Sequence, residues 1–96
     1  MYVTLTTFSY KPGMREAVEK VADNQFTASQ DMKGLKSMTY FINPEENGFG
    51  SFIIWDSKAD AEAAWAIVGP KIQETMSDIL TAPPTRSVYE VYKHKT

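Results

Sequence analysis

Hydroxyl and aromatic side chains in separate segments are the residues of this sequence best suited to hold a small molecule. Thr4 and Thr6 share one face of an expected strand with Tyr2 and Phe8, because alternate residues of a strand point the same way. Hydroxyl groups among aromatic rings can orient a phenol while the rings enclose it. We predict a substrate-binding site formed by Thr4, Thr6, Phe26, Tyr40 and Trp65, with Asn24, Gln25 and Asn43 as further candidates for polar contacts.

Each of these residues also has a structural explanation. Threonine favours strands, so Thr4 and Thr6 can be present for the strand alone. Trp65 lies in an alanine-rich segment at helical spacing, where an indole fills a core as readily as it lines a cleft. Trp55 ends an apolar run and is interpreted as a packing or dimer-contact residue.

No residues form a recognisable catalytic or metal-binding motif. The sequence has no cysteine and one histidine, His94, within the run Lys93-His94-Lys95. A nucleophile activated by histidine needs both side chains within hydrogen-bond reach, which His94 offers only if the tail folds back. The carboxylates fall mostly on polar helix faces or in a turn. We therefore predict no metal site and assign no catalytic residue.

Length and composition indicate one soluble domain covering residues 1–96. The hydrophobic fraction is 43%, and every uninterrupted apolar run, such as residues 52–55, is far shorter than a membrane span. The first residues lack the basic and apolar segments of a secretory signal, so we expect a cytoplasmic protein. The net charge of −2 and the scattered basic residues exclude an extended basic face for nucleic acid.

Hydrophobic periodicity predicts the order strand, helix, strand, strand, helix, strand. Ser57 and Asp60 have the spacing of a capping box at the start of the second helix, and Gly69-Pro70 is expected to kink or break that helix. This order favours an α+β ferredoxin-like sandwich, with four antiparallel strands and two helices on one face. The expected strands are 2–10, 37–43, 49–55 and 86–93, and the expected helices are 14–32 and 58–80.

The first three strands carry apolar or aromatic residues on both faces. A sheet wetted on one side alternates between apolar and polar residues, so the second face also needs a cover. A second copy of the chain, packed sheet on sheet about a two-fold axis, provides one. We predict a homodimer through the sheet face, with a monomer bearing an exposed apolar face as the alternative.

Three short motifs in order resemble the antibiotic biosynthesis monooxygenase domain of the dimeric α/β-barrel superfamily. They are Lys11-Pro12-Gly13-Met14, Trp55-Asp56-Ser57 before an alanine-rich helix, and Val88-Tyr89-Glu90-Val91. The resemblance spans nearly the whole chain and implies a dimeric α/β barrel. It also implies cofactor-independent oxidation of polycyclic phenols by O2, so no cofactor is expected.

One branch of that family degrades haem and uses an Asn on the first strand, a Trp on the second helix and a haem-ligating His beyond it. Alignment on the Pro-Gly turn places Thr6 at the Asn position, and residues 73–75 occupy the ligand region without a histidine. The resemblance therefore favours a cofactor-independent monooxygenase acting on an aromatic or polycyclic molecule in a cleft between helices and sheet. The alternative is a non-catalytic dimeric module that binds a small ligand, including haem, or has a structural role.

Overall fold

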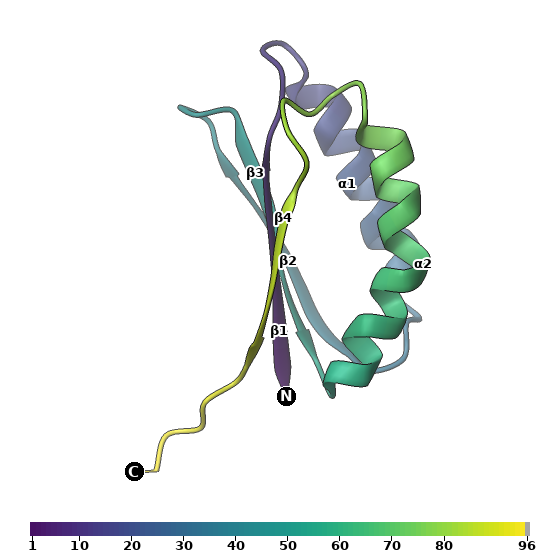
Figure 1. The fold of residues 1–96 in the computed structure, drawn as a ribbon, viewed down its shortest axis with the longest axis vertical. Coiled ribbons are helices and arrows are strands. Elements are labelled where there is room, and N and C mark those ends of the chain that lie inside the picture. Colours follow the sequence, from purple (N-terminus) through teal and green to yellow (C-terminus); the bar gives the residue numbers. More distant parts are fainter. Residues whose placement is uncertain (96) are drawn as a thin grey trace.

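Six elements follow one another in the predicted order in the computed structural model, which describes residues 1–95 (Figure 1). Their bounds match the expected strands and helices within a few residues, except at the C-terminal ends of α2 and β4. The elements are β1 (Tyr2–Ser9), α1 (Arg15–Ser29), β2 (Leu35–Asn43), β3 (Gly48–Trp55), α2 (Lys58–Met76) and β4 (Thr85–Glu90).

The four strands form one antiparallel sheet in the order β2-β3-β1-β4. The central strand β1 pairs Thr4 with Ile53 of β3 on one side and with Val88 of β4 on the other. Both helices cover the same face of the sheet (Figure 1). This is the predicted α+β ferredoxin-like arrangement.

Helix α2 begins where its sequence predicts, with the Ser57 half of the expected capping box formed. Ser57 is the N-cap, and its hydroxyl oxygen accepts a hydrogen bond from the backbone N–H of Asp60 at 3.1 Å. The Asp60 carboxylate lies against Gly34, whose φ of +79° is a conformation that glycine adopts without strain. A side chain at Gly34 would collide with Asp60, so glycine is required there on two grounds.

The second helix was expected to kink or break at Gly69-Pro70. No break occurs, because α2 runs unbroken through Gly69 and Pro70 to Met76. Proline removes one backbone hydrogen bond but leaves the apolar face of the helix in place. Helix α2 packs that face through Ala61, Ala64 and Met76, and such burial outweighs a single lost bond. Helix α1 ends at Ser29, earlier than the predicted residue 32.

The core between helices and sheet consists of two clusters. The larger gathers Val18 and Ala22 of α1 around Phe49 of β3. The smaller holds Trp55 against Ala61 and Ala64 of α2. Trp55 is buried, as its interpretation as a packing residue requires.

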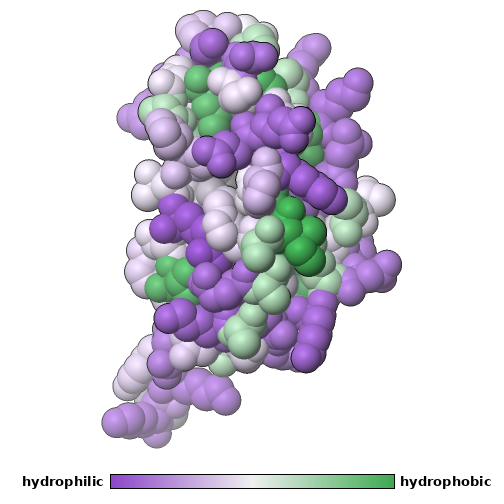
Figure 2. Space-filling model, turned by 45° about the vertical axis from the view of Figure 1, so that its right-hand side comes forward, coloured by the Kyte–Doolittle hydropathy of each residue, from purple (hydrophilic) through white to green (hydrophobic). Residues whose placement is uncertain are grey.

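The opposite face of the sheet is open. By strand alternation it carries Val3, Leu5, Phe41, Phe52 and Ile54, and Phe41 and Phe52 are each 40% exposed. The helical side is different, since its surface is mostly hydrophilic with separate hydrophobic groups between (Figure 2). In residues 1–95, no helix has the length and apolar character needed to cross a membrane.

Candidate functional site

A cavity of about 90 Å³ lies between the helices and the sheet. Side chains from all four strands and both helices line it, and most of them are apolar. Apolar linings that contain a few placed polar groups are typical of small-molecule sites. The polar lining residues are Thr4, Thr6, Gln25, Ser29, Tyr40, Ser51 and Arg86.

Four of these polar residues form a line across the sheet. Strand register pairs Tyr40 with Ser51, Ser51 with Thr6, and Thr6 with Arg86, so the line crosses β2, β3, β1 and β4 in turn. Neighbouring strands lie about 4.8 Å apart, which makes the line roughly 14 Å long between its end Cα atoms. Thr6 and Ser51 at its centre have short side chains, and these leave space above the sheet.

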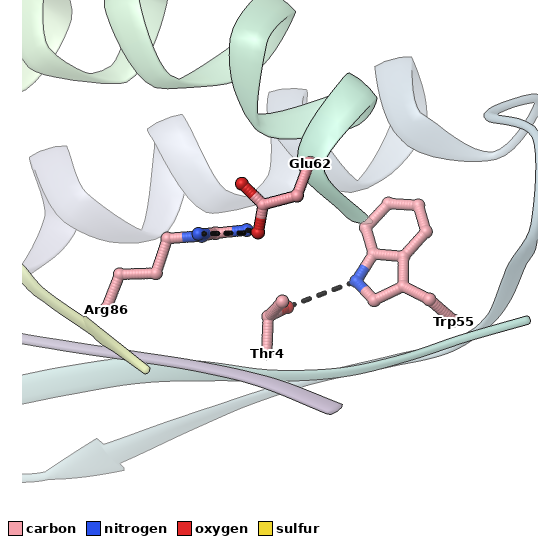
Figure 3. A network of polar contacts seen from close by, with 4 residues as sticks. All are labelled: Thr4, Trp55, Glu62 and Arg86. Carbon is pink, nitrogen blue, oxygen red and sulfur yellow. Dashed lines mark hydrogen bonds and ion pairs between the residues drawn. The ribbon is translucent and has the colours of Figure 1, made fainter. Parts of the chain in front are cut away.

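Thr4 connects this floor to the buried indole of Trp55. The Trp55 Nε1–H donates to Thr4 Oγ1 at 3.1 Å, and both residues are buried (Figure 3). An indole has one donor and no acceptor, so this bond satisfies the only polar group of Trp55. The Thr4 hydroxyl keeps its own proton, which it can donate into the cavity.

We expect Thr4→Val to destabilise the fold by about 1–3 kcal/mol, because valine keeps the shape but leaves the Trp55 N–H unpaired. Urea unfolding followed by tryptophan fluorescence measures this loss. Thr4→Ser retains the hydroxyl and is the matched control. Equal stability of the valine variant and the wild type would contradict a structural role for the bond.

Tyr40 is a hydrogen-bond donor and not a base. Burial raises the pKa of Tyr40 to about 12, and the charge of Asp23 acts in the same direction. The phenol therefore stays protonated at neutral pH. Its ring packs against Phe49, with 5.7 Å between ring centroids, which fixes the tyrosine at the β2 end of the line.

Arg86 and Trp65 stand together at the opposite end. The Arg86 guanidinium lies 4.9 Å from the centroid of the Trp65 ring, within the range of a cation–π contact. Its two terminal nitrogens each lie 3.5 Å from Glu62 Oε1, so Arg86 and Glu62 face each other from β4 and α2 (Figure 3). The Arg86 side chain is only 17% exposed, whereas that of Glu62 is 48% exposed.

Gly69 supports Trp65 one helical turn further along α2. A Cβ atom at Gly69 would lie 2.9 Å from Cε2 of the Trp65 indole and 3.1 Å from Cδ2. The indole therefore rests directly on the glycine backbone. Gly69 sets where the ring stands relative to the cavity.

The structure brings together four of the five predicted site residues. Thr4, Thr6, Tyr40 and Trp65 all line the cavity, and so does the candidate Gln25, which donates to Ser29 at 2.8 Å. Their role in ligand binding stays a prediction.

The fifth predicted site residue, Phe26, lies outside the cavity. This residue is 44% exposed and does not line the cavity. The face of α1 that meets the sheet runs through Val18, Ala22, Gln25 and Ser29, and Phe26 lies to one side of that stripe.

Sequence reasoning missed Ser51 and Arg86. Both belong to strands that the alternation of residue types predicts, but their position beside Thr6 depends on the register between strands. Within residues 1–95, no group of three or more histidine, cysteine, aspartate or glutamate side chains is placed to hold a metal ion.

No protein-family model matches this sequence, and no curated protein matches it. Solved structures do share its fold. A protein from Nitrosomonas europaea, provisionally named an antibiotic biosynthesis monooxygenase, superposes with a TM-score of 0.85 at 19% identity, over 97% of this chain and 100% of that one. A Deinococcus radiodurans protein with the same provisional name gives a TM-score of 0.85 at 12% identity, over 100% and 97% of the two chains.

A third structure, a Nitrosomonas europaea protein of unknown function, gives a TM-score of 0.84 at 16% identity, over 99% of this chain and 92% of that one. Several structures that bear the antibiotic biosynthesis monooxygenase name thus superpose on this chain over nearly their whole length. This chain has the fold of the structures that bear that name.

Proposed function

We propose that this protein is a monooxygenase that uses no cofactor and oxidises a small electron-rich aromatic compound in the cavity between helices and sheet. The observation that carries this proposal is the largely apolar cavity crossed by the line Tyr40, Ser51, Thr6 and Arg86. The shared fold with structures provisionally named antibiotic biosynthesis monooxygenases supports it.

In this reaction the substrate itself supplies the electrons that reduce O2. Ionisation of a phenol places carbanion character on a ring or benzylic carbon, and this carbon forms a bond to O2. Cleavage of the O–O bond leaves one oxygen in the product and releases the other as water. For an activated methylene group the sum is CH2 plus O2 giving C=O plus water, so no external reductant is needed.

The chain then has to position the substrate and exclude water. Thr6 and Tyr40 offer hydroxyl donors to oxygen atoms of the substrate, and Tyr40 keeps its proton because its pKa is raised to about 12. Trp65 covers the cavity from α2.

The cavity volume narrows the class of substrate. An apolar cavity of roughly 150 Å³ accepts benzene, so about 90 Å³ holds a single ring only when that ring extends toward an opening or moves side chains aside. A compound with one ring fits this space better than a polycyclic one, whose further rings would have to lie outside.

A non-catalytic ligand-binding module is the second candidate. It is favoured by the lining of the cavity, to which the described residues 1–95 contribute no histidine, aspartate or glutamate that would act as a base.

Oxygen uptake separates the two candidates. We expect the protein to accelerate O2 consumption by hydroxylated single-ring compounds, such as trihydroxybenzenes, more than by hydroxylated anthracenes. Tyr40→Phe and Thr6→Val should each lower the rate by roughly tenfold or more, as expected for the loss of one positioned donor. Wild-type rates in both variants would contradict the proposed roles, and binding without oxygen uptake would favour the non-catalytic module.

We also propose that a second copy of the chain covers the open face of the sheet. By strand alternation, this face carries no charged residue on β1, β3 or β4 and has Phe41 and Phe52 near its centre. Four strands of this length span roughly 400 Å² of flat area per copy. With side-chain relief, two copies approach the ~1,000 Å² that a specific interface requires.

A further inference from the structure

Among residues 1–95, Arg86 is the only charged residue that lines the cavity. Its side chain is 17% exposed, and the lining around it consists of apolar groups, hydroxyls and one amide. A charge in such surroundings is screened less than one in water, so it attracts an opposite charge strongly. The cavity therefore presents a positive charge at one end and none of the opposite sign.

The partners of Arg86 leave much of its capacity for hydrogen bonding free. Glu62 approaches the two terminal nitrogens at 3.5 Å, well beyond the 2.7–2.9 Å of a strong charge-assisted bond. The remaining contact is with the face of Trp65, which uses no N–H donor. A guanidinium has several N–H donors arranged to grip a planar anion at two points, and these remain available toward the cavity.

The register places hydroxyl groups next to this cation. Thr6 is paired directly with Arg86, and Ser51 lies one strand beyond Thr6. Both have short side chains, so a flat ring can lie above them. Tyr40 ends the line with a neutral hydroxyl donor, and the apolar side chains of Met38 and Ile53 lie on the neighbouring row.

We infer that the ligand of this cavity is a small aromatic monoanion whose oxyanion is bound by Arg86 and whose ring lies over Thr6 and Ser51. This inference rests on the proposed function only for the location of the site, and it adds the residue that binds the negative charge of the ligand. The anionic group is a carboxylate or a phenolate, since both present oxygen acceptors in the plane of a ring.

Matched probes that differ in charge test this inference without any turnover. Benzoate, benzamide and benzylamine have nearly the same shape and carry negative, zero and positive charge. Titration against tryptophan fluorescence, repeated by calorimetry, gives the affinity of each probe. We expect benzoate to bind at least roughly tenfold more tightly than benzamide, as a charged hydrogen bond predicts, and benzylamine to bind least. 4-Nitrophenol, titrated below and above its own pKa, tests the phenolate.

Three variants locate the charge effect. Arg86→Gln should remove the preference for benzoate over benzamide while leaving benzamide affinity within about twofold. Glu62→Gln keeps Arg86 and removes its only ion-pair partner among residues 1–95, so it should raise benzoate affinity several-fold. Lys71→Gln makes the same change of charge as Arg86→Gln at an exposed position on α2 and should change nothing.

Equal affinity of wild type for benzoate and benzamide would overturn the inference, and so would an undiminished preference in Arg86→Gln. Absence of saturable binding by both benzoate and nitrophenolate would overturn it as well. If Arg86→Gln does not fold, the effect of Glu62→Gln decides, because a fall or no change in benzoate affinity contradicts the assignment. Anion binding without oxygen uptake would support the inference and contradict only the monooxygenase.

Discussion

Phe52→Asp is expected to convert the proposed dimer into a monomer that keeps its fold. Phe52 is 40% exposed and lies near the centre of the open sheet face, paired with Leu5 and Thr39 on the adjacent strands. In a two-fold dimer the substitution occurs in both copies. Two apolar contacts are therefore lost, and two carboxylates would have to be desolvated at the interface. Burial of each phenylalanine contributes about 1.5–3 kcal/mol, and we expect the dissociation constant to rise by roughly a thousandfold or more.

Light scattering coupled to size-exclusion chromatography measures this change as a halving of the mass. Phe26→Asp is the matched control, because Phe26 is similarly exposed at 44% but lies on α1, on the other side of the sheet. A wild-type chain that is already monomeric would contradict the dimer, and so would a Phe52→Asp variant that keeps the wild-type mass.

Gly69→Ala is expected to impair the cavity while leaving the protein folded. Alanine in a helix interior is favoured over glycine by about 1 kcal/mol, which offsets much of the 1–3 kcal/mol cost of overpacking. The new methyl group would stand 2.9 Å from Trp65 Cε2, so the indole has to move. Because Arg86 lies over that indole, the guanidinium also loses its support.

We therefore expect Gly69→Ala to weaken benzoate binding by at least roughly tenfold, while its free energy of unfolding falls by no more than about 2 kcal/mol. Gln73→Ala, at an exposed position one turn further along α2, is the control. Unchanged affinity in the Gly69 variant would mean that the position of Trp65 does not shape the site.

The fold could be predicted from the sequence because local signals agreed with one another. The capping residues Ser57 and Asp60 marked the start of α2, and the turn at Asn47-Gly48 separated two alternating strands. The error at Gly69-Pro70 arose because the rule for proline considers the backbone alone. Packing of α2 against the sheet is a tertiary effect that no local pattern contains.

The site could be predicted only in part. Thr4, Thr6 and Tyr40 were found because alternation along one strand reveals which residues share a face. Arg86 and Ser51 were missed because their neighbours depend on the pairing of strands that are distant in sequence. Phe26 was misplaced because helical periodicity does not decide whether a residue at the edge of an apolar stripe faces the core or the solvent. In the structure Phe26 is exposed.

Isotope labelling shows whether the cavity promotes the reaction of an aromatic substrate with O2, as we propose. Wild-type protein is incubated with a trihydroxybenzene or a dihydroxybenzoate under ¹⁸O2, and the mass of the product is measured by mass spectrometry. We expect the product to contain one labelled oxygen and to form faster than in buffer, and we expect the Tyr40→Phe variant to form it more slowly than the wild type. Product formation at the buffer rate, or oxygen derived from water alone, would contradict this proposal.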